Sequence, residues 1–310
     1  MSEPRVHFVR GGSAYLPELD AYRQHLSASG WQCEVHESAA TVPAGAGVVW
    51  WLCGRVPRGA ATQWPGAFHV HEYASASVPP LAWVKDKVKR LSHPAPQHRV
   101  FQNEWVRKRL RFADAVPFSE RDMGVPAFFL SALPSGPAEF DLVYLGETSR
   151  LAAFQGALKA IADAGLTLLV VGSVDEPLRD YMHGLGNVQL AGKMAQQDVP
   201  AQLLRARAGL NLMPDRLPFS AQTSTKVLEY LAVGLPVVGN DYRWITSVAR
   251  EFPQRVRTLD VGDATAWRAA GSQIAPVQQD RSHLSHFTWA SRLHGLPVWD
   301  ALQKWRESQP

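Results

Sequence analysis

Lys226 and Glu229 are side chains whose types and spacing suit the binding of a polar ligand. They stand in the segment STKVLEYLAVGLPVVGND at residues 224–241, which predicts a helix that closes at Gly234. Residues three apart share one helix face. The free N–H groups and positive dipole of the helix start, together with Lys226, can hold a diphosphate, and the Glu229 carboxylate can accept hydrogen bonds from a ribose diol. The alternative is a plain surface Lys–Glu pair, which contributes only about 0.3–0.5 kcal/mol.

Two glycines form a second candidate ligand loop. Gly11 and Gly12 follow a short apolar run, VHFV at residues 6–9, and precede a helical pattern. Without a Cβ atom, their backbone N–H groups can approach a bound anion or sugar closely. A tight turn with no ligand needs the same glycines, so both interpretations stay open.

Strands and helices alternate along the chain in two runs. The first run has strand patterns at residues 6–9, 31–36, 47–54 and 68–73 and a helix pattern at 16–26. After a Pro, Ser and Gly cluster at 133–140, the second has strand patterns at 141–146, 166–172, 187–192, 209–214 and 235–240 and helix patterns at 151–164, 200–208 and 224–234. This alternation predicts an α/β protein with parallel sheets. We expect one domain at residues 1–136, a second at 137–280 and a terminal helical segment at 281–310.

The composition is that of an ordinary globular protein. A chain of 310 residues with 46% hydrophobic and 19% charged residues predicts about two domains. The first residues lack the apolar stretch of a secretory signal, and no apolar run reaches the roughly 18 to 20 residues that span a bilayer, so we expect a cytoplasmic protein. Cys33 and Cys53 stand in apolar segments, which favours buried, reduced thiols.

Positive charge is concentrated at residues 81–111. This segment has nine basic and two acidic residues, interleaved with aromatic ones, whereas the whole chain nets only +4. The pattern fits an anionic membrane surface, a phosphorylated acceptor or nucleic acid, and a solvated helix face is the alternative. Acidic and basic residues nearly balance over the whole chain, so we expect no nucleic acid partner. A peripheral position on an anionic inner membrane and a solvated helix face both stay open.

The segment at 224–241 resembles the signature S-x-K-x-x-E-Y-x-A-x-G-x-P-V-V of glycosyltransferases with the GT-B fold. The stretches DLVYLGETSR and GNVQLAGKMAQQDVPAQLLRARAGLNLMP are similar to the strands and loops that precede this signature. The resemblance implies two Rossmann-like domains facing a cleft, with a terminal helix, HFTWASRLHGLPVWDALQKW, crossing back to the first. It also implies that Glu229 binds the ribose. The diphosphate site that it implies consists of Ser224, Thr225, Lys226 and Arg150. The implied loop beside the base consists of Gly192, Lys193 and Met194.

One position departs from the family pattern. Many retaining members have a second glutamate eight residues before the ribose-binding one, and here that position is Ala221. Polar groups of Ser220, Gln222 and Thr223 can replace the lost contacts to the donor sugar, or they can merely cap the helix.

The first lobe matches the family less sharply. HVHEYASASVPPLAWVKDKVKR resembles the segment after the fourth strand of bacterial polysaccharide and lipopolysaccharide glycosyltransferases, where a histidine or carboxylate faces the transfer point. The candidates are His69, His71 and Glu72. In an inverting reaction one of them takes the acceptor proton, and in a retaining one His71 contacts the donor sugar. By strand period the two histidines share one face and Glu72 the other, and a core histidine is the alternative.

The resemblance implies a glycosyltransferase of the hexosyltransferase type. It takes the sugar from a nucleoside diphosphate and passes it to a glycan or lipid-linked acceptor in cell-surface polysaccharide synthesis. His93 and His98 lack the spacing of a zinc site, and no D-x-D pair stands in a suitable loop, so we expect no metal and no cofactor. The alternative function is a non-catalytic GT-B-like scaffold or sugar-nucleotide sensor, which the missing second glutamate favours.

Overall fold

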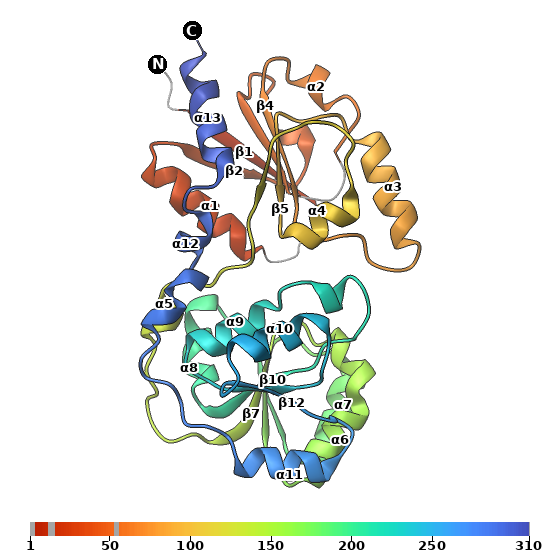
Figure 1. Ribbon diagram of the computed structural model, residues 1–310, viewed down its shortest axis with the longest axis vertical. Helices are drawn as coiled ribbons and strands as arrows, with labels where there is room; N and C mark the ends of the chain where they lie inside the picture. Colours follow the sequence, from red (N-terminus) through yellow and green to blue (C-terminus); the bar gives the residue numbers. More distant parts are fainter. Residues whose placement is uncertain (1–3, 12–15, 53–55, 310) are drawn as a thin grey trace. The chain divides into compact units, whose positions relative to one another are not determined.

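A computed structural model describes residues 4–11, 16–52 and 56–309 of the chain. It contains two compact units, one made of Met1–Met123 with Trp289–Pro310 and the other of Gly124–Thr288. Each unit has a six-stranded parallel sheet covered by helices (Figure 1). The predicted α/β class with two Rossmann-like units is therefore confirmed.

The first unit is built on a sheet with the strand order β2-β1-β3-β4-β5-β6. Its strands are β1 (Arg5–Arg10), β2 (Gln32–His36), β3 (Val48–Leu52), β4 (Phe68–Tyr73), β5 (His98–Phe101) and β6 (Phe118–Glu120). Its helices are α1 (Pro17–Ala28), α2 (Ala60–Gln63), α3 (Ala82–Ser92), α4 (Glu104–Leu110), α12 (Trp289–Leu293) and α13 (Pro297–Glu307), with the 3-10 helix η1 (Ala39–Thr41). Buried Phe8, Tyr22 and Trp50 form an aromatic centre, on which α12 and α13 pack from the end of the chain.

The second unit has the strand order β12-β11-β10-β7-β8-β9. Its strands are β7 (Phe140–Leu145), β8 (Leu168–Val171), β9 (Val188–Gly192), β10 (Ala206–Asn211), β11 (Val237–Gly239) and β12 (Val256–Thr258). Its α-helices are α5 (Phe128–Ser131), α6 (Gln155–Asp163), α7 (Glu176–Leu185), α8 (Val199–Leu203), α9 (Thr225–Ala232), α10 (Arg243–Glu251) and α11 (Ala264–Ser272), and its 3-10 helices are η2 (Ser149–Phe154), η3 (Gln196–Asp198), η4 (Phe219–Ala221) and η5 (Ser282–Phe287). Because β7 lies between β8 and β10, the direction in which the sheet is wound reverses between β7 and β10.

Strand β10 differs from its predicted range. It runs three residues earlier than the predicted strand at 209–214, and the helix expected at 200–208 ends at Leu203. Neighbouring β11 ends at Gly239, so the chain after Asn211 has no further strand to pair with there. Instead, the Asn240 side chain pairs with both backbone groups of Met213.

The units divide after Met123 and after Thr288, whereas the sequence placed these boundaries at 136 and 280. Hydrogen bonds explain the difference. The Val125 N–H donates to the Phe287 carbonyl, and the Arg281 guanidinium donates to the carbonyls of Ala132 and Val233. Residues 124–132 and 281–288 are thereby joined to each other and to the end of α9.

Two further observations concern the bilayer and the thiols. Within the described ranges, no helix combines the length and apolar character that crossing a bilayer requires. Cys33 is a free, half-buried thiol, and loss of hydration raises its pKa to about 11. Cys53 lies outside the described residues.

Candidate functional site

The candidate site lies where the winding of the second sheet reverses. In open parallel sheets, ligands bind beyond the carboxyl ends of the strands at such a switch point. Strand β7 leads into residues 146–154 and β10 into residues 212–224, after which α9 begins at Thr225. The loops on both sides of the switch point therefore meet the start of α9.

Lys226 lies in the first turn of α9. Its half-buried side chain places Nζ 3.6 Å from the centre of the Tyr144 ring, which belongs to β7. Loss of hydration and the nearby Arg150 guanidinium lower the pKa of Lys226 to about 7, against the opposing effects of Glu229 and Glu147. The ammonium is thus a charge without full compensation, as expected for a group that awaits an anionic ligand.

Glu229 lies one turn further along α9. Its side chain is half-buried, and loss of hydration raises its pKa to about 8, with Lys226 acting in the opposite direction. Among the described residues, its carboxylate has neither an ion pair within 4.0 Å nor a side-chain hydrogen bond. Such a carboxylate keeps its full capacity to accept hydrogen bonds from a ligand.

Two arginines extend the positive charge of the site. The Arg150 guanidinium lies 4.7 Å from the centre of the Phe219 ring and 3.8 Å from the Met213 sulfur. Exposed Arg216 lies 5.8 Å from the centre of the same ring. Sequence reasoning selected Arg150 but missed Arg216 and Phe219, which stand in a loop with no regular spacing.

The start of α9 is not capped by a side chain. Ser224 occupies the N-cap position, but its Oγ donates to Asn211 Oδ1 at 3.3 Å instead of closing the helix. The N–H groups of the first turn, at Thr225 and Lys226, therefore receive no side-chain oxygen from Ser224. Anions bind at helix starts of this kind.

The loop before α9 contains an unsatisfied amide. Gln222 Nε2 is buried and has no hydrogen-bond partner among the described residues. Its neighbours Ser220 and Ala221 are buried, and Thr223 is half-buried. A buried donor without a partner is uncommon in proteins and marks this loop as a place for a polar ligand.

Tyr230 fixes the position of Glu229. Its hydroxyl accepts from the Leu145 N–H at 2.8 Å and donates to the Leu210 carbonyl at 3.2 Å, which joins α9 to β7 and β10. The ring covers Gly209 so closely that a Cβ atom there would lie 2.2 Å from it. This packing explains why a tyrosine follows the glutamate in this segment.

The loops after β7, β8 and β9 follow one another along the sheet edge. The Gly146 N–H donates to the Val171 carbonyl, and the Gly172 N–H donates to the Gly192 carbonyl. Gly172 has φ of +148°, and a Cβ atom there would lie 2.2 Å from the Gly146 oxygen, so only glycine fits. Gly192 ends β9, whereas Lys193 is exposed and Met194 half-buried beyond it. Their contact with a base stays a prediction.

The first unit places His69, His71 and Glu72 in the buried strand β4. His69 Nδ1 accepts from the Trp51 indole at 3.2 Å, and Glu72 accepts from the Trp50 indole at 2.8 Å. Since successive residues of a strand point to opposite faces, this confirms that the histidines and Glu72 lie on different faces.

Glu72 belongs to a buried ionic cluster. Its side chain is 1% exposed and forms an ion pair with Arg121, which also lies 3.4 Å from Glu18 and donates to the Tyr22 hydroxyl. A carboxylate held in this way cannot reach an acceptor hydroxyl. The assignment of Glu72 as a candidate base is therefore corrected to a structural role.

His71 is buried, and its Nδ1 has no hydrogen-bond partner among the described residues. Burial lowers the pKa of His71 well below 6.5, so the ring is neutral at pH 7. His69 is buried as well, with an unpartnered Nε2. Gly11 follows β1, is exposed and has room for a Cβ atom, whereas Gly12 lies outside the described residues.

The architecture of two parallel α/β units is that of GT-B proteins. Residues 139–274 match the family described as glycosyl transferases group 1. The chain thus has the GT-B fold, as the resemblance implied, and the matched family segment lies within its second unit. A search of curated protein sequences finds no significant match.

Several solved structures share the fold at low identity. AviGT4, a glycosyltransferase involved in avilamycin A biosynthesis, has 16% identity and a TM-score of 0.63, with 98% of this chain and 97% of that chain covered. HepE from Anabaena, solved with UDP and glucose, has 11% identity and a TM-score of 0.65, with coverages of 97% and 100%. WaaG, a glycosyltransferase involved in lipopolysaccharide biosynthesis, has 13% identity and a TM-score of 0.56, with coverages of 98% and 95%.

Proposed function

We propose that this protein transfers a hexose-type sugar from a nucleoside diphosphate to a glycan or lipid-linked acceptor in cell-surface polysaccharide or lipopolysaccharide synthesis. The observation that carries the proposal is the half-buried Lys226–Glu229 pair at the start of α9, which lacks a full set of partners. The solved structures of HepE, with UDP and glucose, and of WaaG, from lipopolysaccharide biosynthesis, support the donor class and the pathway.

The nucleotide groups are assigned as follows. Glu229 accepts hydrogen bonds from the ribose hydroxyls, and the loop of Gly192, Lys193 and Met194 borders the base. The diphosphate lies at the start of α9, where Lys226 and Arg150 contact it. Ser220, Gln222 and Thr223 face the donor sugar, where the partnerless amide of Gln222 supplies a donor.

In the reaction, the bond between the anomeric carbon and the diphosphate oxygen breaks, and a bond from an acceptor oxygen to that carbon forms. Negative charge develops on the leaving diphosphate. Lys226, Arg150 and the N–H groups of α9 stabilise this charge without a metal ion. In an inverting reaction the acceptor proton passes to a base, for which neutral His71 is the candidate. In a retaining reaction the proton passes to the leaving diphosphate oxygen, and His71 contacts the donor sugar.

A nucleotide-binding experiment tests the donor site. A panel of nucleoside diphosphates is screened for thermal stabilisation, and the dissociation constant of the best ligand is measured for Glu229→Gln. We expect a loss of about 1 to 3 kcal/mol, roughly 5- to 150-fold, because the ribose hydroxyls lose a charged partner. Glu176→Gln, at an exposed glutamate of α7, is the matched control. Unchanged affinity in Glu229→Gln would remove the site.

A scaffold or sugar-nucleotide sensor is the second candidate, favoured by Ala221 at the position of the second family glutamate. Both candidates bind the nucleotide, so binding does not separate them. Release of free nucleoside diphosphate from the donor in the absence of acceptor supports the enzyme, because slow hydrolysis needs a functioning leaving-group site. Binding without any release supports the sensor.

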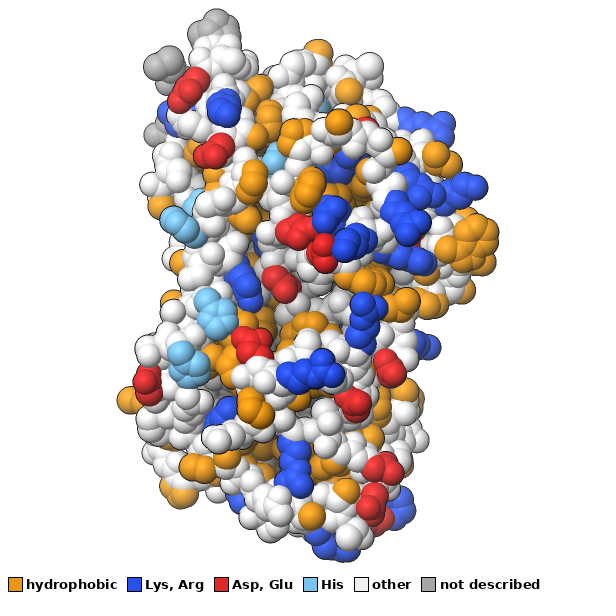
Figure 2. Space-filling view, in the orientation of Figure 1, with side chains coloured by type: hydrophobic (Ala, Val, Ile, Leu, Met, Phe, Trp, Pro, Cys, Tyr) orange, Lys and Arg blue, Asp and Glu red, His pale blue; other side chains and the backbone are white. Residues whose placement is uncertain are grey.

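We further propose that α3 attaches the protein to the cytoplasmic face of an anionic membrane. Asp86 is the one buried residue of this helix, where it accepts from the Ser77 N–H and pairs with Arg109. Trp83 and Leu91 are 64% and 70% exposed. Figure 2 shows basic and apolar side chains gathered over α3 and α4. This composition suits a helix that lies in the headgroup region.

Not all of the basic residues at 81–111 are available to a membrane. Arg99 is buried and paired with Asp114, and Arg107 pairs with Glu120. The exposed or half-buried basic side chains of α3 itself are those of Lys85, Lys87, Lys89 and Arg90. The proposal therefore rests on α3 and not on the whole segment.

A further inference from the structure

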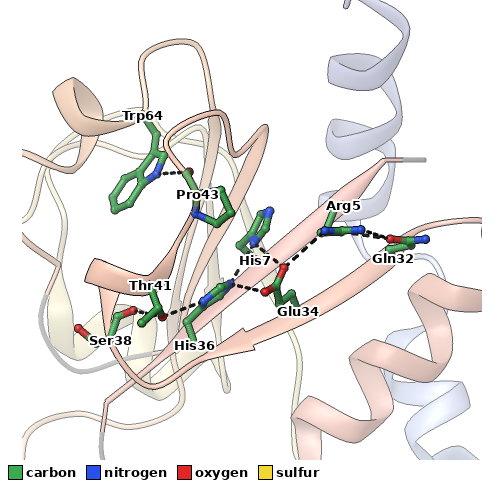
Figure 3. Close-up of polar contacts among 9 residues, drawn as sticks. All are labelled: Arg5, His7, Gln32, Glu34, His36, Ser38, Thr41, Pro43 and Trp64. Atoms are coloured by element: carbon green, nitrogen blue, oxygen red, sulfur yellow. Dashed lines mark hydrogen bonds and ion pairs between the residues drawn. The ribbon is translucent and has the colours of Figure 1, made fainter. Parts of the chain in front are cut away.

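The first unit contains a cluster of two histidines and a glutamate that no part of the transfer reaction uses. His7 lies in β1, and Glu34 and His36 lie in the edge strand β2. Both histidines are 4% exposed, whereas Glu34 is exposed. Their ligand atoms, one for each residue, all lie within 4.8 Å of one another (Figure 3).

Parallel pairing brings these residues together. His7 is in register with Glu34, and Val9 is in register with His36, so all three side chains project from one face of the sheet. His7 Nδ1 lies 3.0 Å from His36 Nε2 and 3.6 Å from Glu34 Oε2, and His36 Nε2 lies 4.0 Å from Glu34 Oε1. The spacing along the sequence gives no sign of this cluster.

A hydroxyl group fixes the tautomer of His36. Thr41 Oγ1 donates to the Ser38 carbonyl at 2.9 Å, so its contact with His36 Nδ1, also 2.9 Å long, uses the hydroxyl as acceptor. His36 therefore carries its proton on Nδ1, and the lone pair of Nε2 points at His7. In metal sites, a second ring nitrogen bonded to such an outer partner orients the ligand nitrogen in this way.

We propose that His7 Nδ1, His36 Nε2 and a Glu34 oxygen bind a divalent cation of the zinc class. Two imidazoles and one carboxylate form a common three-residue ligand set for Zn²⁺, with a fourth position left to water. Zinc–nitrogen bonds of about 2.0–2.1 Å at a tetrahedral angle separate the nitrogens by roughly 3.3 Å. The observed 3.0 Å therefore needs an opening of only a few tenths of an ångström.

The surroundings hold the carboxylate beside the two histidines. Arg5 Nη1 lies 3.6 Å from Glu34 Oε2, and its guanidinium also donates to Gln32, which holds the carboxylate on the strand edge. The exposed carboxylate gives solvent ions access to the buried nitrogens. A bound cation joins β1, β2 and, through Thr41, the short helix η1, so we expect it to stiffen the edge of this sheet. Without a cation, the histidines are limited to one hydrogen bond between them.

Metal titration of the full-length protein tests the site. After treatment with a chelator, the protein is titrated with Zn²⁺ by calorimetry and with Co²⁺ by visible absorption, which reports the ligand geometry. We expect one tight equivalent, an intense low-symmetry Co²⁺ spectrum and a higher melting temperature with Zn²⁺. Thr41→Val should weaken binding by about 10- to 100-fold, and His36→Ala and Glu34→Gln should weaken it by more.

Surface histidines supply the control. His283→Ala with His286→Ala removes an exposed histidine pair from η5 of the second unit and should leave the tight equivalent unchanged. Glu34 and Thr41 are exposed, so their variants remain informative if His36→Ala fails to fold. Unchanged binding in Glu34→Gln and Thr41→Val, loss of binding in the η5 variant, or no tight equivalent at all would each overturn the proposal and leave a hydrogen-bonded histidine pair.

Discussion

The ammonium nitrogen of Lys226 lies 3.6 Å from the centre of the Tyr144 ring, so a cation from α9 contacts an aromatic face from β7. An aromatic face attracts a cation but gives it no hydrogen bond. The N–H donors of the ammonium that point away from the ring therefore stay available to an oxygen-rich ligand. This contact holds the charge in place across the switch point of the sheet.

Removing this charge should weaken binding of the diphosphate and not of the nucleoside. For Lys226→Met we expect a loss of about 1.5–3 kcal/mol, roughly 10- to 150-fold, in affinity for the nucleoside diphosphate. The affinity for the matching nucleoside should stay the same, because the base and ribose contacts remain. Calorimetry with both ligands measures the difference. Lys159→Met, at an exposed lysine of α6 that pairs with Asp163, is the control. Equal weakening of both ligands would show that Lys226 acts through the fold and not on the phosphates.

Nucleotide affinity should fall as the pH rises above about 7. In the ligand-free protein the pKa of Lys226 is about 7. A bound diphosphate favours the charged ammonium and therefore raises this pKa. Binding then takes up protons, so the dissociation constant should rise by up to about tenfold per pH unit over the first units above pH 7. Calorimetry in buffers of different ionisation enthalpy counts these protons. A flat profile in the wild type, or the same slope in Lys226→Met, would assign the pH dependence to another group.

Glu229 and Lys226 make the stability of the ligand-free protein depend on pH in opposite directions. The pKa of Glu229 is raised from 4.5 to about 8, so the folded state binds more protons and the unfolding free energy falls as the pH rises through that interval. The pKa of Lys226 is lowered from 10.5 to about 7, so its contribution to stability increases with pH between these values. Comparing the urea midpoints of the wild type and Glu229→Gln from pH 4 to 8 isolates the contribution of Glu229. The difference between the two midpoints should become independent of pH at low pH, where the carboxyl group is protonated in both the folded and the unfolded state. A constant difference would show that Glu229 does not titrate in this range.

Much of the donor site could be predicted because it depends on local sequence. Lys226 and Glu229 are neighbours on one helix face, and the glycine and proline that follow mark the end of that helix. Tyr144 and Phe219 could not be selected in this way, because only the pairing of β7 with β10 brings their segments to the same place. Periodicity places an apolar or aromatic residue inside a unit, but it does not say which ring contacts a cation.

In the first unit as well, the sequence predicts which face of a strand a residue occupies but not which residue it contacts. The alternation of β4 correctly separated Glu72 from the histidines, yet no local pattern pairs Glu72 with Arg121, which stands 49 positions later. Isolated carboxylates are rarely buried, so a carboxylate in an apolar strand indicates either a catalytic group or an internal ion pair. The distinction depends on the partner, and the partner is set by the tertiary fold. The same holds for Glu34, which a strand pattern describes only as an exposed residue.

The ionic cluster of Glu18, Glu72 and Arg121 should act on stability. Arg121→Met leaves two buried carboxylates without their cation, so we expect a loss of about 3–5 kcal/mol in the unfolding free energy of the first unit. Arg107→Met removes a partly exposed ion pair with Glu120 and should cost no more than about 1 kcal/mol. Urea unfolding measures both. A Glu72→Gln variant with native stability but no transferase activity would restore Glu72 as a candidate base.

Helix α3 should bind anionic vesicles through both charge and apolar contact. A lysine near an anionic surface contributes about 1 kcal/mol, so Lys85→Gln with Lys87→Gln should weaken binding by about 30-fold and reduce its salt dependence. Trp83→Ala should weaken binding at high salt as well, because it removes apolar area that enters the headgroup region. Leu217→Ala, at a leucine of the second unit that is 48% exposed, is the control and should bind as the wild type does. Flotation with anionic and with zwitterionic vesicles measures these effects. Equal recovery with both kinds of vesicle, or wild-type binding of the double lysine variant, would contradict attachment through α3.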